Sequence, residues 1–381
     1  MRRYGFLGES IPPYTFPVKG YFPTMKKFTS WLLCALLCAS LCPTLTACKS
    51  CGKPSVRNES HTVSTAETEA APQGSTIVDP ADRTYDPALY VVIRTAEDLM
   101  AFNRAVNEDG YPFDGMTVVF LNDVDMGDHV WSPLDGRMLA GVTFDGLGHT
   151  VSNLRFADYE HPLDAEPDHD GKGCGLVGVA TRDMVFRDLT LAHTSVTAYD
   201  HSVGNFVGSV YGGTVTFENC RSVDFTAEGW MDWLDRDRDR GGHAVAMRMG
   251  GFVGYVGEGG RVKFTGCSVE ALSLSGFHNL AGFVGYDGSG ELDASAFADC
   301  RVTGADITFS YCLAENYTAE QAKKLVSVFF NGADHTDNLD ACTVLGNRFE
   351  DVTFYDWADD CTAYTPEHFR SWTREEAEPH D

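Results

Sequence analysis

The first regular pattern of apolar positions along the chain is helical. Leu99, Phe102 and Val106 fall on one face of a helix. Thr95 precedes this run, and Asp98 lies three positions after Thr95. This is the spacing of a capping box at a helix N-terminus. The pattern predicts a helix over residues 95–107 and a folded body that starts near Leu89.

Beyond this helix the apolar residues form short strand-like runs separated by Gly, Asn and Asp. Near-copies of one unit follow: GLVGVATRDMVFRDL (175–189), NFVGSVYGGTVTFENC (205–220), GFVGYVGEGGRVKFTGC (251–267) and GFVGYDGSGELDASAFADC (282–300). Each copy joins an F-V-G or L-V-G unit to a second unit that ends in F-x-x-C or F-x-x-L. A fifth, degenerate copy is predicted at 328–342, where Leu339 takes the place of the phenylalanine before Cys342.

Two sets of residues mark the period of this repeat. The glycines are Gly178, Gly208, Gly254 and Gly285, at intervals of 30, 46 and 31 residues. The phenylalanines are Phe186, Phe217, Phe264 and Phe297, at intervals of 31, 47 and 33. A period of about 30 residues made of short strands predicts a solenoid. We therefore expect an all-β fold, a right-handed parallel β-helix over residues 89–355, with the helix 95–107 capping its N-terminal end and an insertion at 224–249.

The repeated positions also predict what each residue does. Stacked coils place equivalent residues above one another at about the 4.8 Å strand spacing, so the phenylalanines should form an interior ladder. The glycines are expected at corners, where backbone angles or close approach exclude a side chain. Cys220, Cys267 and Cys300 share one position with Leu189. This exchange with leucine favours buried thiols that act as packing groups, with disulfides or metal binding as alternatives.

The segments TAEDLMAFNRAVN and FDGLGHTVSNLRF, together with the GLVG and FVG units, carry a family resemblance. They resemble the GLUG-motif and related β-helix lipoproteins of Bacteroidetes-type bacteria, over roughly residues 90–300. The resemblance implies a pectin-lyase-like solenoid and a role in surface binding or adhesion. It implies no defined set of catalytic residues.

The N-terminal region has the pattern of an export signal. From Met25, two lysines precede a short apolar run that ends in Leu45-Thr46-Ala47-Cys48, which resembles the bacterial lipobox. We expect residues 1–47 to be a leader whose true start is Met25, and Cys48 to be lipidated; an ordinary signal peptide cut near Ala47 is the alternative. Residues 48–88 then form a polar, flexible tether.

Charge and composition limit the partners. The chain has 55 acidic and 29 basic residues, a formal net charge of −26, so we expect nucleic acid and anionic lipid surfaces to be poor partners and no nucleic acid to be bound. Hydrophobic residues make up 43% of the chain, enough for a substantial core. The membrane partner is therefore expected to be reached through the lipid anchor, in the bacterial cell envelope at the outer membrane, with the periplasmic or surface face left open.

The insertion carries the most unusual local chemistry, in the stretch AEGWMDWLDRDRDRGGH. Asp235, Asp237 and Asp239 alternate like the oxygen ligands of a calcium loop. Ala246 stands where an EF-hand needs glutamate, so the alternatives are another kind of calcium site or a loop whose arginines neutralise it. Trp230 and Trp233 beside it are candidates either to stack on a sugar ring or to pin the loop to the coil.

Together these patterns predict an adhesin-like lipoprotein whose solenoid presents a surface to a glycan or protein ligand. No catalytic residues are assigned, and no cofactor other than calcium is indicated. A carbohydrate-active enzyme, glycosidase or lyase, is the main alternative and would need two carboxylates about 5–10 Å apart. A structural envelope component is the second. Residues 356–381 are expected to form a tail or a short helix.

Overall fold

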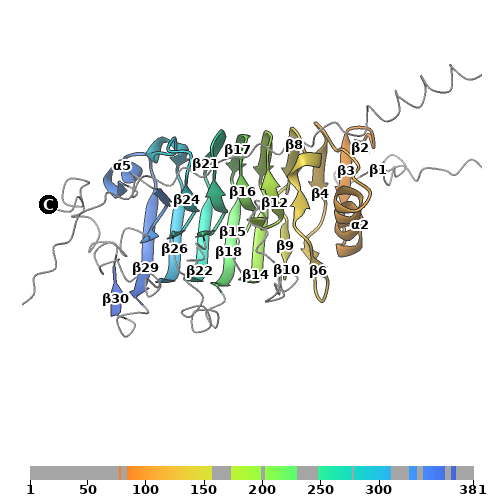
Figure 1. Ribbon diagram of the computed structural model, residues 1–381. Helices are drawn as coiled ribbons and strands as arrows, with labels where there is room; N and C mark the ends of the chain where they lie inside the picture. The colour runs from red at the N-terminus through yellow and green to blue at the C-terminus, as the bar shows by residue number, and fades with distance from the viewer. Residues whose placement is uncertain are drawn as a thin grey trace, which may run out of the picture. The chain divides into compact units, whose positions relative to one another are not determined.

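The computed structural model describes residues 77–78, 84–156, 173–198, 202–229, 248–276, 279–309, 326–332, 338–356 and 362–365. All of them belong to one unit, residues 67–381. This unit is mostly β, and its strands pair in parallel except for β1 with β2 and β29 with β30. The architecture is that of an all-β, solenoid-like fold (Figure 1).

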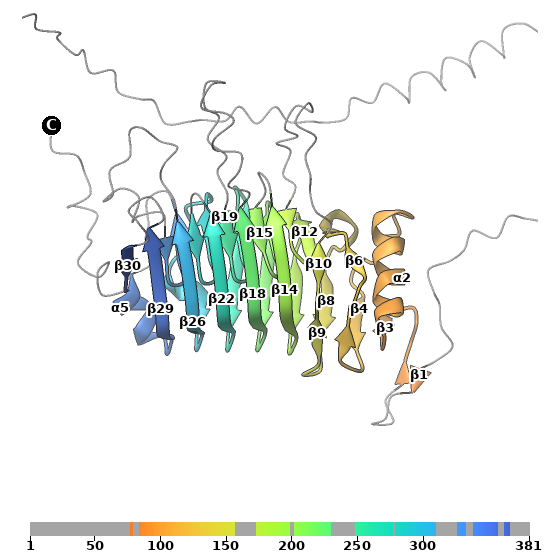
Figure 2. The same ribbon diagram turned by 90° about the horizontal axis from the view of Figure 1, so that it is seen from below.

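The chain passes repeatedly through four sheets. The ten-stranded sheet contains β30 (Thr362–Tyr364), β29 (Arg348–Asp356), β26 (Arg301–Phe309), β22 (Ser268–Gly276), β18 (Arg221–Gly229), β14 (Thr190–Ala198), β10 (Arg155–Phe156) and β6 (Val130–Trp131), with β9 (Thr150–Ser152) and β5 (Val124–Asp125) beside them. The seven-stranded sheet contains β25 (Phe297–Ala298), β21 (Gly260–Thr265), β17 (Gly213–Glu218), β13 (Met184–Arg187), β8 (Val142–Asp145), β4 (Thr117–Phe120) and β3 (Tyr90–Ile93). Figure 2 shows the long strands of the ten-stranded sheet side by side.

Two further sheets complete each turn of the chain. The six-stranded sheet contains β28 (Phe330–Gly332), β24 (Val284–Asp287), β20 (Val253–Val256), β16 (Val207–Val210), β12 (Val177–Ala180) and β7 (Leu134–Asp135). The five-stranded sheet contains β11 (Gly173–Cys174), β15 (Ser202–Gly204), β19 (Arg248–Gly250), β23 (Leu280–Ala281) and β27 (Val326–Ser327). Two short 3-10 helices, η1 (Gly136–Met138) and η3 (Ala294–Ala296), lie between strands. One repeat therefore visits the five-, six-, seven- and ten-stranded sheets in that order, as β15 to β18 do.

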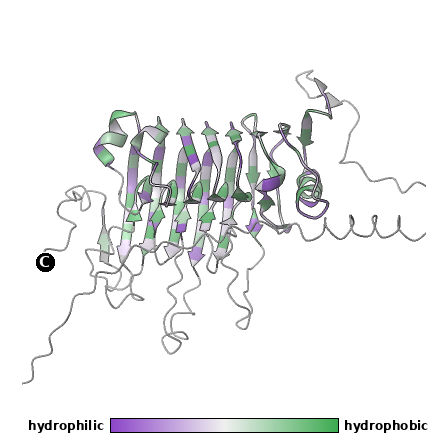
Figure 3. Cartoon of the chain, turned by 45° about the horizontal axis from the view of Figure 1, so that its top comes forward, coloured by the Kyte–Doolittle hydropathy of each residue, from purple (hydrophilic) through white to green (hydrophobic). Residues whose placement is uncertain are grey.

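The core is built from two columns of phenylalanine rings. The first is the predicted ladder: Phe186, Phe217, Phe264 and Phe297 lie in register, with ring centroids 5.2, 4.8 and 5.0 Å apart. The second contains Phe206, Phe252 and Phe283, whose centroids are 4.7 and 5.0 Å apart. Rings of the two columns meet edge to face, a favourable aromatic geometry. The strand β21 alternates accordingly between buried and exposed residues, and Figure 3 shows hydrophobic and hydrophilic residues alternating along several strands.

The predicted role of the repeat glycines is wrong in part. Gly178, Gly208, Gly254 and Gly285 lie within strands of the six-stranded sheet and not at corners. A side chain is excluded there because the five-stranded sheet passes too close. A Cβ added at Gly254 would lie 2.4 Å from the Val203 backbone nitrogen, and one at Gly208 would lie 2.3 Å from the Cys174 nitrogen.

Left-handed backbone at the corners is provided by other residues. The corner between the seven- and ten-stranded sheets has positive φ in successive repeats at Leu147, Asp188, Asn219, Gly266, Asp299 and Gly346. A second column of positive φ lies within the strands of the ten-stranded sheet, at His193, Asp224, Ala271, Gly304 and Asp351. Asn, Asp and Gly tolerate this conformation best, which explains most of these positions.

A helix covers each end of the stacked strands (Figure 2). At the N-terminal end α2 (Ala96–Asn107) matches the predicted helix and has the predicted capping box, with Thr95 accepting from the Asp98 backbone. Its buried residues join the core, where Phe102 meets Phe144 edge to face. At the C-terminal end α5 (Leu339–Val344) replaces a strand. The predicted equivalence of Leu339 is therefore wrong: Phe330 stacks on Phe297, at 5.5 Å.

Three predicted boundaries also change. The tether predicted over 48–88 overlaps β1 (Ile77–Val78) and β2 (Thr84–Tyr85), and Tyr85 is buried beside Val119 and Leu121. The insertion predicted at 224–249 includes strand residues of β18 and β19, which leaves 230–247 between them. In the predicted C-terminal tail, β30 pairs antiparallel with β29. Strand pairing extends further in each case than the local composition indicated.

Candidate functional site

The residues predicted for lipidation, calcium binding and ligand binding all lie outside the described residues. These are the lipidation residue Cys48, the tryptophans Trp230 and Trp233, and the candidate calcium ligands Asp235, Asp237 and Asp239. Within the part of the chain that the structure describes, no group of three or more His, Cys, Asp and Glu side chains is arranged to hold a metal ion.

The repeated cysteines form a buried column of free thiols. Cys220, Cys267 and Cys300 are each almost fully buried, and each thiol donates to the carbonyl oxygen two residues before it. Burial raises the pKa of Cys267, and the neighbouring Cys267 thiol together with burial raises that of Cys300. Thiols held protonated in this way are poor nucleophiles and poor metal ligands. The column serves packing.

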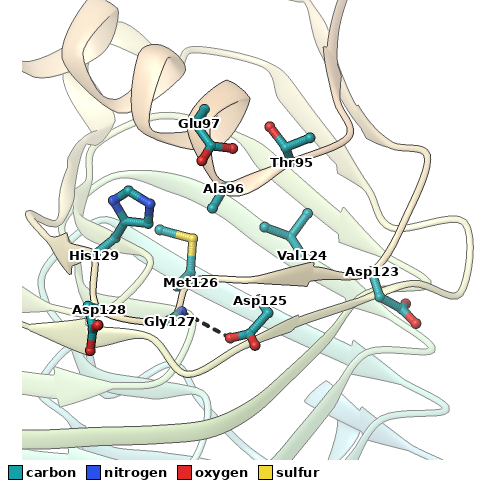
Figure 4. A pocket seen from close by; sticks show the side chains of 10 residues that line it. All are labelled: Thr95, Ala96, Glu97, Asp123, Val124, Asp125, Met126, Gly127, Asp128 and His129. Carbon is teal, nitrogen blue, oxygen red and sulfur yellow. Dashed lines mark hydrogen bonds between the residues drawn. The ribbon is translucent and has the colours of Figure 1, made fainter.

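A pocket of about 560 Å³ lies between the N-terminal turn of α2 and the chain around β5 and β6 (Figure 4). Thr95 and Glu97 line one side, and residues 123–129 line the other. Figure 4 shows the His129 ring of the facing segment close to Glu97, whereas the carboxylate of Asp123 points away. Asp125 accepts from the Gly127 backbone N–H at 2.9 Å and from the Asn153 side-chain amide at 2.7 Å.

The carboxyls of this pocket favour the ionised form. Backbone and Thr95 hydrogen bonds hold the pKa of Glu97 below its usual range, with a smaller contribution from His129. Hydrogen bonds from the Thr150 N–H and from His149 lower the pKa of Asp123. Hydrogen bonds from the Asn153 side-chain amide and the Gly127 N–H lower the pKa of Asp125. A general acid needs the opposite shift. These groups therefore give the pocket negative charge and not an acid catalyst.

A second cluster lies on the six- and five-stranded sheets, and we call it the tyrosine–arginine surface: Tyr211, Tyr255, Tyr286 and Arg248. The Tyr255 and Tyr286 rings are stacked at 6.0 Å, and Tyr211 meets Tyr255 edge to face at 5.5 Å. The Arg248 guanidinium carbon lies 4.2 Å from the Tyr255 ring centroid and 5.4 Å from that of Tyr286. These are cation–π distances.

The missing side chains of two glycines leave space for tyrosine side chains to pack closely against the backbone. A Cβ at Gly257 would lie 2.6 Å from the Tyr211 ring, and one at Gly288 would lie 2.5 Å from the Tyr255 hydroxyl. The Tyr211 ring nevertheless remains 41% exposed. Burial of the rest of the side chain and the neighbouring Tyr255 raise the pKa of Tyr211, so its hydroxyl is protonated near neutral pH. The result is a rigid aromatic platform at the surface.

This surface was not predicted from the sequence. Its signal is present in the repeats, because Tyr255 and Tyr286 each follow the F-V-G unit directly. The third ring and the arginine follow no such pattern. Tyr211 lies directly after β16, two positions beyond the residue that pairs with Tyr255, and Arg248 precedes the repeat, so only the folded chain brings all four together.

Comparisons with known proteins add no family or function. No protein-family model, no curated protein and no solved structure gives a significant match to this chain. Within the described part of the chain, none of the helices has the length and apolar character that a membrane crossing requires.

Proposed function

We propose that this chain is an envelope-anchored bacterial lipoprotein whose repeated body is a right-handed parallel β-helix that binds glycans. The parallel register of successive repeats and the two phenylalanine columns support the β-helix. The Leu45-Thr46-Ala47-Cys48 segment supports the anchor. The resemblance to GLUG-motif lipoproteins supports a role in adhesion.

The tyrosine–arginine surface is the observation that carries glycan binding. An aromatic ring exposed at a protein surface provides apolar contact area with a hydroxyl at its edge, which suits the mixed apolar and polar faces of a sugar ring. Tyr255 and Tyr286 lie in neighbouring strands of a sheet and Tyr211 directly follows the next strand, β16, so little conformational freedom is lost when a ligand binds. A partly exposed Tyr211 beside stacked Tyr255 and Tyr286 fits this use.

The enzymatic alternative receives less support from the described residues. A glycosidase needs a protonated carboxyl acting with a second, ionised carboxylate. In the pocket beside α2, the pKa values of Glu97, Asp123 and Asp125 are all lowered, so none of these three carboxyls is favoured in the protonated state. The pocket geometry therefore does not argue for hydrolysis.

Glycan-array binding by the full chain tests the proposal. We expect capture of a defined set of glycans, with signal reduced about tenfold or more in Tyr211→Ala because the exposed ring is lost. Tyr90→Ala is the matched control, since that ring packs on Tyr85 away from the proposed surface. Equal capture by Tyr211→Ala and the unaltered chain, or no capture at all, would contradict the proposal.

A further inference from the structure

The guanidinium of Arg248 is unusual among the arginines of this acidic chain. Several others pair with carboxylates: Arg137 with Asp135, Arg187 with Asp145, Arg221 and Arg301 with Glu270, and Arg261 with Glu291. Arg248 forms no ion pair with any residue that the structure describes, and its Nε is buried without a hydrogen-bond partner. A buried donor left in this state destabilises the fold.

The two tyrosine rings hold this cation in place. Arg248 lies in β19 and contacts Tyr255 of β20 and Tyr286 of β24, so three strands fix its position. Contact with ring faces stabilises a cation without using its N–H groups. A guanidinium has five such donors in a planar fork that matches a carboxylate. The surface therefore combines an aromatic platform with an anchored guanidinium that has no carboxylate partner among the described residues.

We propose that the tyrosine–arginine surface selects glycans that carry a carboxylated sugar, whose carboxylate accepts hydrogen bonds from Arg248 while the sugar ring packs on Tyr211. This inference rests on the glycan binding proposed above and adds the chemical class of the ligand.

Net charge limits the ligand further. At a formal charge of −26, the chain repels long polyanions, and one unpaired arginine is too little to offset that repulsion. A glycan with a single acidic residue avoids most of the repulsion. The matching ligand is therefore a neutral oligosaccharide ended by one acidic sugar, either a sialic acid or a hexuronic acid.

Calorimetric titration of the full chain distinguishes these sources. The probes are sialyllactose and a glucuronosyl disaccharide, each beside its carboxyl methyl ester, which keeps the ring and removes the charge. We expect at least one acid to bind about tenfold or more tightly than its ester, as a charge-assisted hydrogen bond provides. Binding of only one acid would identify the source. If each ester binds as tightly as its acid, the carboxylate inference is overturned and glycan binding remains intact. If none of the four probes binds, the inference is overturned and the result also counts against glycan binding.

Variants at Arg248 give an independent test. Arg248→Gln should remove the preference for acid over ester, and Arg248→Lys should lose most of it because an ammonium lacks the planar fork. Arg261→Gln is the matched control: it removes one positive charge from an exposed pair with Glu291 in the repeat of Arg248. If Arg248→Gln unfolds, Tyr211→Ala remains informative because its ring is partly exposed. An acid preference that survives in Arg248→Gln would overturn the inference.

Discussion

Ala271 adopts a conformation that suits glycine better. Its φ is +53°, and the equivalent residue in the next repeat is Gly304, at +64°. A left-handed conformation costs an L-residue with a Cβ about 1–2 kcal/mol, partly offset by the greater freedom of glycine in the unfolded chain. We expect Ala271→Gly to raise the free energy of unfolding by about 0.5–1 kcal/mol, measured by chemical denaturation.

Gly304→Ala is the reciprocal change. The nearest neighbours of the added Cβ would be the backbone of Ala271 at 3.7 and 3.8 Å, which is ordinary contact. Conformational strain alone should therefore lower the free energy of unfolding, again by about 0.5–1 kcal/mol. Opposite signs at the two positions would support the strain argument. A loss of stability in both variants would show that side-chain packing determines the outcome.

Glu270 connects three repeats through its carboxylate, and it determines part of the response to acid. It accepts hydrogen bonds from Arg221 at 2.8 Å, Arg301 at 2.9 Å and Ser268 at 2.8 Å. Burial by itself raises its pKa, but these hydrogen bonds outweigh burial and the pKa is lowered from 4.5. A carboxyl with a lowered folded-state pKa stabilises the fold above its unfolded-state pKa, and this contribution is lost as pH falls through the folded-state value.

Glu270→Gln should therefore reduce the acid sensitivity of the fold. We expect the denaturation midpoint to fall less between about pH 6 and about pH 3, a window that spans the unfolded-state pKa and the lowered folded-state pKa, in Glu270→Gln than in the unaltered chain. Glu350→Gln is the control, because Glu350 occupies the equivalent position on β29 and forms no ion pair with a described residue. An identical acid dependence in Glu270→Gln and the unaltered chain would show that the cluster contributes nothing to it.

At the scale of elements, the second phenylalanine column makes the clearest prediction. Phe252 stacks on Phe206 and Phe283 and meets Phe217 and Phe264 edge to face. Phe252→Ala should lower the free energy of unfolding by about 3–5 kcal/mol because it leaves a cavity between repeats. Phe252→Leu should cost less, since Leu176 occupies the equivalent position in the first repeat. Similar losses in the two variants would contradict a role based on volume.

The elements also show what the sequence could and could not predict. Spacing alone located α2, its cap and the first phenylalanine ladder, because these depend on local pattern and on a period that recurs. The positions of the repeat glycines were predicted wrongly because the need for glycine arises from contacts between repeats. At Gly254, the backbone of Val203 in the preceding repeat leaves no space for a side chain. The tyrosine–arginine surface was missed for the same reason, since Arg248 becomes a neighbour of Tyr286 only when two repeats stack.

At the scale of the whole molecule, the proposed anchor determines where the binding surface acts. If Cys48 is acylated, the full chain expressed in a lipoprotein-processing bacterium should partition with membranes and incorporate labelled fatty acid, because two or more acyl chains hold a protein firmly at a bilayer. Cys48→Ser should abolish the label. Cys51→Ser, three residues further along the same segment, should leave it unchanged. Label retained in Cys48→Ser would place the acylation elsewhere. An unlabelled, membrane-free product from the unaltered chain would favour an ordinary signal peptide cut near Ala47. The proposed glycan-binding surface would then belong to a soluble exported protein.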